Sequence, residues 1–166
     1  MTKYGAGELK AFDRNRGLRE LRDDSYLNHI HDLEVTNIRI LFHELGYTQW
    51  LSERTLSKFY GLRRIPDGMI FYQDQYIAIE YEASLKAKRR YQRIFLDYEL
   101  DRQVNKVLYI TDTPEILQKV LKEADAYDKL YFVSLKDLQR DRMNTKLIKP
   151  TSSHTLHEFF HFDFKT

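Results

Sequence analysis

The chain has 166 residues, of which 42% are hydrophobic and 31% are charged, a composition typical of one soluble globular domain. The formal net charge is only +2, so overall charge does not indicate a polyanionic partner, and only a local basic patch would do so. Cysteine is absent, which excludes disulfides, thiolate nucleophiles and cysteine-based zinc sites. No run of residues approaches a membrane span, and the amino terminus lacks the apolar core of a signal peptide, so we expect a cytoplasmic protein without membrane association.

The first part of the chain predicts an arm followed by a long helix. Residues 1–24 are polar and glycine-containing, which indicates a loose N-terminal arm ahead of a single domain over residues 25–150. Ser25 can cap a helix whose apolar positions recur at helical spacing, and Gly46 is a natural stop. Residues 47–59 suit either a strand or a short helix.

The rest of the chain alternates between strands and helices. Residues 65–84, IPDGMIFYQDQYIAIEYEAS, predict two apolar strands joined by a short polar turn. Further on, the patterns predict a helix that Ser84 caps, over about 85–101, a strand at 104–111, a helix at 115–127, a strand at 129–135 and a short helix at 136–142. Residues 151–166 form a C-terminal tail, whose alternation at 160–164 suits an edge strand. This order predicts an α/β sandwich with a mixed central sheet flanked by helices.

Acidic side chains gather at one end of the predicted hairpin. A two-residue turn at Gln73-Asp74 places Asp67 opposite Glu80, and cross-strand neighbours have Cβ atoms roughly 5 Å apart. Glu82 shares the face of Glu80, because side chains alternate along a strand. Three carboxylates there repel one another and are costly to desolvate, and Mg²⁺ or Mn²⁺ would relieve both problems. The alternative is that they are solvated or paired with the nearby cations Arg63, Arg64 and Lys86.

A run of cations opens the helix that follows the hairpin. Lys86, Arg90 and Arg93 fall at i, i+4 and i+7, and Lys88 and Arg89 flank them. A basic stripe beside a carboxylate cluster suits a phosphodiester substrate, because cations hold phosphates while a metal ion acts at the scissile bond. The alternative is a solvated helix face whose cations balance acidic residues later in the same helix.

The hairpin resembles the PD-(D/E)xK nuclease pattern: PDG at 66–68, then an apolar strand that ends in an acidic-x-acidic triplet at 80–82. The resemblance implies a restriction-endonuclease-like fold in which Asp67 and Glu80 bind a divalent metal ion. The lysine position of the pattern holds Glu82, so Lys86 would have to assist the attacking water from the following helix. Nuclease folds of this type often take a further carboxylate from the first helix, here Glu34 or Glu44.

A second resemblance covers about residues 29–98. HDLEV at 31–35, WLSE at 50–53, IPDG at 65–68 and EYE at 80–82, followed by Ser84, Lys86 and Tyr91, are similar to the replication-relaxation family of plasmids and mobile elements. The resemblance implies a DNA-acting protein involved in plasmid replication or DNA relaxation. His31 matches the family pattern, although a lone helix histidine is more often a packing or hydrogen-bonding residue.

The C-terminal tail contains the H-E-x-x-H pattern of zinc proteases at His157, Glu158 and His161. The alternating sequence around it favours a strand, which would break the helical spacing that the motif needs, and only five residues follow the motif. We therefore expect no protease site.

Three functions remain open at this point. The first is a divalent-metal endonuclease or nickase with Asp67, Glu80 and Glu82 as ligands of Mg²⁺ or Mn²⁺ and with Lys86 assisting. The second is a non-catalytic DNA-binding or replication accessory module with a degenerate nuclease fold. The third is a domain that recruits replication or transfer proteins or forms a homodimer.

Overall fold

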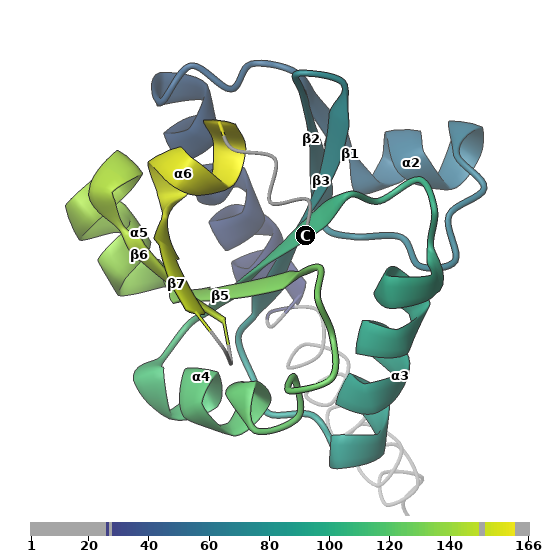
Figure 1. Cartoon of the computed structure of the whole chain (residues 1–166). Coiled ribbons are helices and arrows are strands. Elements are labelled where there is room, and N and C mark those ends of the chain that lie inside the picture. Colours follow the sequence, from purple (N-terminus) through teal and green to yellow (C-terminus); the bar gives the residue numbers. More distant parts are fainter. Residues whose placement is uncertain (1–25, 27, 150–151, 162–166) are drawn as a thin grey trace, which may run out of the picture.

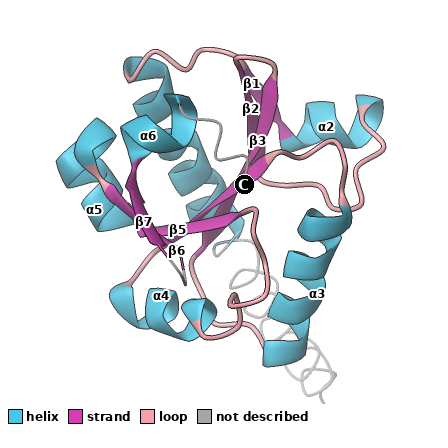
Figure 2. Ribbon diagram, viewed as in Figure 1, coloured by secondary structure: helices cyan, strands magenta, loops and turns pink. Residues whose placement is uncertain are grey.

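The computed structural model describes residue 26 and residues 28–149 and 152–161, so the predicted N-terminal arm lies outside the described residues (Figure 1). Within them, seven strands form one sheet in chain order, as Figure 2 shows in magenta. The strands are β1 (Trp50–Ser52), β2 (Gly68–Tyr72), β3 (Gln75–Glu82), β4 (Lys106–Thr111), β5 (Leu130–Ser134), β6 (Lys146–Lys149) and β7 (Ser152–Thr155). β3, β4 and β5 run parallel, and the other neighbouring pairs are antiparallel. The predicted α/β architecture with a mixed sheet is confirmed.

Helices connect the strands and cover both faces of the sheet. The first helix spans residues 28–44, and the others are α2 (Glu53–Phe59), α3 (Lys88–Leu100), α4 (Pro114–Leu121), α5 (Leu135–Asp141) and α6 (Leu156–His161). The first helix, α5 and α6 bury their apolar side chains in one core, and α3 and α4 bury theirs in the other (Figure 1). In β3, Ile77 and Ile79 belong to the first core and Ala78 to the second, as the alternation of a strand between two layers requires.

The hairpin that organises the site has the predicted register. Gln73 and Asp74 have φ values of 47° and 58°, so the turn is of the type that matches strand twist in two-residue hairpins. Tyr72 pairs with Gln75, and Gly68 pairs with Ile79. The next residue on each strand is therefore Asp67 on one side and Glu80 on the other.

Two predicted elements are corrected. The helix after Ser84 begins three residues later than expected, at Lys88, so Lys86 lies in the loop before α3 and not on its basic stripe. The loop keeps this course because the Lys86 backbone N–H donates to the Tyr91 hydroxyl at 3.0 Å, and no side chain caps the helix. A hydrogen bond within this short segment thus replaces the expected cap by Ser84.

The C-terminal tail does contain an edge strand, but at a different position from the expected one. Residues 156–161 are the helix α6 and not part of an edge strand, while the edge strand is β7, which pairs with β6. The cause is a capping box: the Thr155 hydroxyl accepts the Glu158 N–H at 3.1 Å, and the Glu158 carboxylate accepts the Thr155 N–H at 2.7 Å. Phe159 and Phe160 are both buried in the core that contains the first helix.

Residues 47–59, which suited either a strand or a helix, contain both, since β1 leads directly into α2. The Ser52 hydroxyl accepts the Thr55 N–H and caps α2. Gly46, with φ of 95°, follows the first helix in the expected left-handed conformation. No helix in the described ranges is long and apolar enough to cross a membrane.

Candidate functional site

The three predicted carboxylates lie at one end of the β2–β3 hairpin. Asp67 directly precedes β2, while Glu80 and Glu82 are among the last three residues of β3. The Asp67 carboxylate accepts the backbone N–H of Tyr81 at 2.7 Å, which ties the loop before β2 to the strand between the two glutamates. Sequence spacing and structure thus bring the same three side chains to one end of the sheet.

Glu80 is almost fully buried, with 5% of its surface exposed. One carboxylate oxygen, Oε1, accepts a hydrogen bond from Arg64 Nε at 2.6 Å and another from the Tyr98 hydroxyl. Burial raises the pKa of Glu80 above its ordinary value, repulsion from Asp67 adds to the rise, and the ion pair with Arg64 opposes it. Arg64 therefore opposes the effect of burial and favours the anionic form of Glu80.

Glu82 is buried to the same degree, with 2% exposed, and has a cationic partner of its own. Its Oε2 accepts hydrogen bonds from Lys86 Nζ and, at 3.0 Å, from the Tyr109 hydroxyl. Lys86 reaches Glu82, one of the three carboxylates, and does so from the loop before α3.

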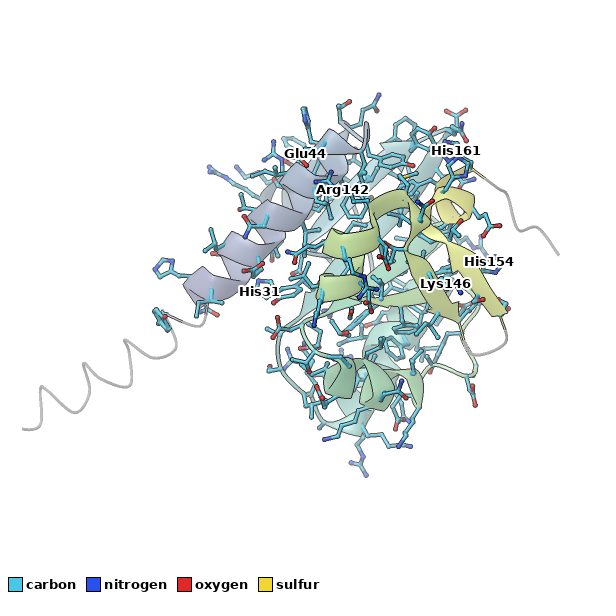
Figure 3. All side chains as sticks on the ribbon, turned by 90° about the vertical axis from the view of Figure 1, so that its left-hand side faces the viewer. His31, Glu44, Arg142, Lys146, His154 and His161 are labelled. Carbon is cyan, nitrogen blue, oxygen red and sulfur yellow. The ribbon has the colours of Figure 1, made fainter. Side chains whose placement is uncertain are left out.

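Asp67 faces the first helix. His31 Nε2 lies 3.5 Å from Asp67 Oδ2 and 3.3 Å from the Tyr81 carbonyl oxygen. The hydrogen bond to Asp67 is the main cause that raises the pKa of His31 to about 9, so the imidazole is protonated at neutral pH. Figure 3 shows His31 at one end of the first helix and Glu44 at the other, where Glu44 pairs with Arg142 at 3.1 Å. Glu44 is therefore remote from the carboxylates, and Glu34 is hydrogen-bonded to its helix neighbour Asn37.

Each carboxylate of the site consequently has one cationic partner: His31 for Asp67, Arg64 for Glu80 and Lys86 for Glu82. In the part of the chain that the structure describes, no three acidic or histidine side chains are arranged to hold a metal ion. A Mg²⁺ or Mn²⁺ ion at the three carboxylates would therefore have to compete with protein cations that already balance their charge.

The H-E-x-x-H residues are helical after all, but they do not form a zinc site. His157 and His161 stack with ring centroids 4.3 Å apart. Both ring nitrogens of His161 have partners, the His157 carbonyl oxygen and the Tyr72 hydroxyl, and Glu158 is engaged in the capping box. The motif serves to build α6.

The basic residues surround the start of α3 and line two pockets. The first pocket has a volume of about 320 Å³ and a lining that includes Lys86, Lys88, Lys119 and Lys122. Lys88 also pairs with Glu123 at 3.0 Å.

The second pocket, which we call the four-arginine pocket, has a volume of about 490 Å³ and is lined by Arg63, Arg64, Ile65, Arg90, Arg93, Ile94 and Asp97. The pocket brings Arg90 and Arg93 of the predicted basic stripe next to Arg63 and Arg64, which lie in the loop before β2. The dibasic pair before PDG was the only sequence signal for this arrangement, and sequence spacing alone gave the pair no place beside α3.

Comparisons of the chain with protein-family models, with curated proteins and with solved structures gave no match.

Proposed function

We propose that this protein acts on DNA and holds the phosphate backbone at the cationic surface around the start of α3. The observation that carries the proposal is the pair of basic pockets on the two sides of this helix, next to the carboxylate end of the sheet. The formal net charge of the whole chain is only +2, so this concentration of cations is local. A local positive surface attracts the phosphate backbone independently of base sequence.

The fold that we propose is restriction-endonuclease-like. Two features support it: the hairpin carries the acidic residues at one end of the sheet, and helices cover both faces. The similarity of four motifs to the replication-relaxation family leads us to place the protein in a plasmid or mobile element, in replication or DNA relaxation, with DNA and replication or transfer proteins as partners.

A second candidate is a divalent-metal-dependent endonuclease or nickase. Asp67, Glu80 and Glu82 lie at one end of the hairpin beside the cationic surface, and Lys86 reaches Glu82. Mg²⁺ or Mn²⁺ would have to displace Arg64 or Lys86 from a carboxylate, since both cations are in contact with the glutamates. Binding without cleavage therefore accords better with the arrangement of the residues.

DNA binding is tested with a triple variant in which Arg89, Arg90 and Arg93 become Gln. Lys86 is left in place, because its loss would leave Glu82 without its cation. The affinity for duplex DNA should fall for all sequences alike, and the slope of log affinity against log salt should decrease by up to about 3. If the triple variant binds DNA as tightly as a control variant with three substitutions on other parts of the surface, the proposal is refuted.

The matched control removes three exposed cations elsewhere, Arg39, Lys136 and Lys146, also as Gln substitutions. Arg39 lies on the first helix and Lys136 on α5, and both helices pack on the opposite face of the sheet from α3. The control changes net charge by the same amount, so only a local effect separates the two variants.

Cleavage is tested separately by nicking of supercoiled plasmid with Mg²⁺ or Mn²⁺. Asp67→Asn removes one carboxylate charge at the site, and Asp74→Asn makes the same change in the hairpin turn at the other end of the strands. A nickase would lose activity with Asp67→Asn and keep it with Asp74→Asn. If neither nicking nor metal binding by calorimetry is detected in the unmodified protein, the cleavage candidate is discarded and DNA binding remains.

A further inference from the structure

The four-arginine pocket contains a preorganised donor, Arg64. Its Nε is fixed by Glu80, and its guanidinium carbon lies 5.9 Å from the centroid of the Tyr98 ring. Only 27% of the side chain is exposed. The two terminal nitrogens donate no hydrogen bond to a described residue, so the outer side of the guanidinium fork is available to a ligand.

The other three arginines bring further charge to the same pocket. None of the guanidinium groups of Arg63, Arg90 and Arg93 makes an ion pair within the described part of the chain. Asp97 is the one acidic residue that lines the pocket, so the lining carries an excess of positive charge. Four like charges with fewer carboxylates beside them repel one another, and a bound anion would reduce this repulsion.

The loop that carries the first two arginines is held in place. The Arg63 backbone N–H donates to Asp101 Oδ2 at 2.8 Å, and Asp101 is buried at the end of α3. The same carboxylate accepts the Gln103 N–H at 2.9 Å through its other oxygen. The two walls of the pocket are therefore joined, and less ordering is needed when a ligand binds.

We propose that the four-arginine pocket binds a phosphate group and that, in the full function, this is a backbone phosphate of DNA. Arginine suits this ligand because its planar fork donates two parallel hydrogen bonds to phosphate oxygens. A volume of about 490 Å³ is within the range of small-ligand pockets and exceeds what one ion needs, so a sugar attached to the phosphate also fits. The source of the phosphate rests on the proposed function, whereas the anion site does not.

The first experiment measures the anion site directly. Sodium phosphate is titrated into the full chain while NMR follows the arginine Nε–H signals, with sodium chloride at equal ionic strength as the reference. Phosphate should shift the signals of Arg64 and Arg93, and that of Arg39, on the opposite face, should not move. Shifts no larger than those in chloride would overturn the proposal.

The second experiment uses variants of opposite sign with duplex DNA. Arg93→Gln should lower the affinity about tenfold, which is the effect expected for one charge-assisted hydrogen bond. Asp97→Asn should raise it by about two- to fivefold, because it removes a repulsive charge at a partly exposed site. A loss of affinity in Arg93→Gln could come from misfolding, but a gain of affinity in Asp97→Asn could not. The second variant therefore separates an effect on binding from an effect on folding.

Arg39→Gln is the matched control for Arg93→Gln, since both residues are exposed arginines on helices and neither makes an ion pair with a described residue. If Arg93→Gln and Arg39→Gln bind DNA equally well, the pocket does not hold the backbone and the inference fails, although DNA binding elsewhere would stand. If phosphate and a mononucleotide shift the arginine signals but duplex DNA does not bind, the anion site stands and the proposed function fails.

Discussion

Arg64→Met should destabilise the protein by about 3 kcal/mol at neutral pH. The substitution keeps much of the side-chain volume and leaves Glu80, whose side chain is 6% exposed, without its cation. Removal of one partner of a buried ion pair costs roughly 3–5 kcal/mol, and the low end applies because 27% of the Arg64 side chain is exposed. For a chain of 166 residues, about 3 kcal/mol corresponds to a decrease in Tm of roughly 6–12 °C.

The size of this effect should depend on pH in a defined direction. Burial raises the pKa of Glu80 in the folded protein above its ordinary value of 4.5, and loss of Arg64 raises that pKa further. A carboxyl group with a raised folded pKa binds its proton more tightly in the folded state, so its contribution to stability is greatest below pH 4.5 and is lost as pH rises through the folded pKa. The difference between Arg64→Met and the unmodified protein should therefore shrink as pH is lowered.

Urea unfolding followed by the fluorescence of Trp50, the single tryptophan, measures this difference. Arg63→Met is the control, because the neighbouring arginine is exposed, its guanidinium makes no ion pair with a described residue, and its loss should change stability by less than about 0.5 kcal/mol. An effect of Arg64→Met no larger than that of the control, or one that is equal at pH 5 and pH 8, would refute the proposed pairing.

Local patterns in the sequence predicted most of the sheet. The apolar run of β3, the polar two-residue turn before it and the alternation of the strands determine the hairpin register, since a slip by one residue would turn every buried side chain toward the wrong layer. For the same reason, the position of Asp67 beside Glu80, and of Glu82 at the same end of β3, could be derived from residue numbers alone.

The partners of these carboxylates were less accessible to sequence reasoning. Arg64, Lys86 and His31 had been considered, but which carboxylate each one contacts depends on the course of the loops and on the packing of the first helix. Neither the course of a loop nor the packing of one helix on a sheet follows from a periodic pattern in the sequence. The sequence left open whether a metal ion or the nearby cations balance the three carboxylates, and the folded chain supplies one protein cation to each: Arg64 and Lys86, as the second alternative had it, and His31.

The C-terminal error has a different origin. The capping box of Thr155 and Glu158 is a local signal and was present in the sequence, but the alternation of Phe160, Phe162 and Phe164 suggested a strand. Two of these phenylalanines lie outside the described residues, while Phe160 packs in the core from α6 beside Phe159. Adjacent buried aromatics fit a short helix inserted at the sheet edge, and a capping signal is better evidence than three alternating residues.

Three further predictions concern other parts of the structure. Thr155→Val removes the hydroxyl that caps α6 and should cost about 1 kcal/mol of stability, measured by urea unfolding. The NMR titration of His31 should have a midpoint near its raised pKa of about 9, and a midpoint near 6.5 would contradict the pairing with Asp67. The ion pair should therefore stabilise the protein fully below pH 6.5, and this stabilisation should be lost as pH rises through about 9. Gly68→Ala should destabilise by about 1–3 kcal/mol, because the added Cβ would overlap the Trp50 ring in the neighbouring strand. The ring must move to make room, so the fluorescence of Trp50 should change in the folded state as well as on unfolding. Gly61→Ala, where nothing lies within 4 Å of the added Cβ, should leave both stability and fluorescence unchanged, and equal behaviour of the two variants would show that Trp50 does not cover Gly68.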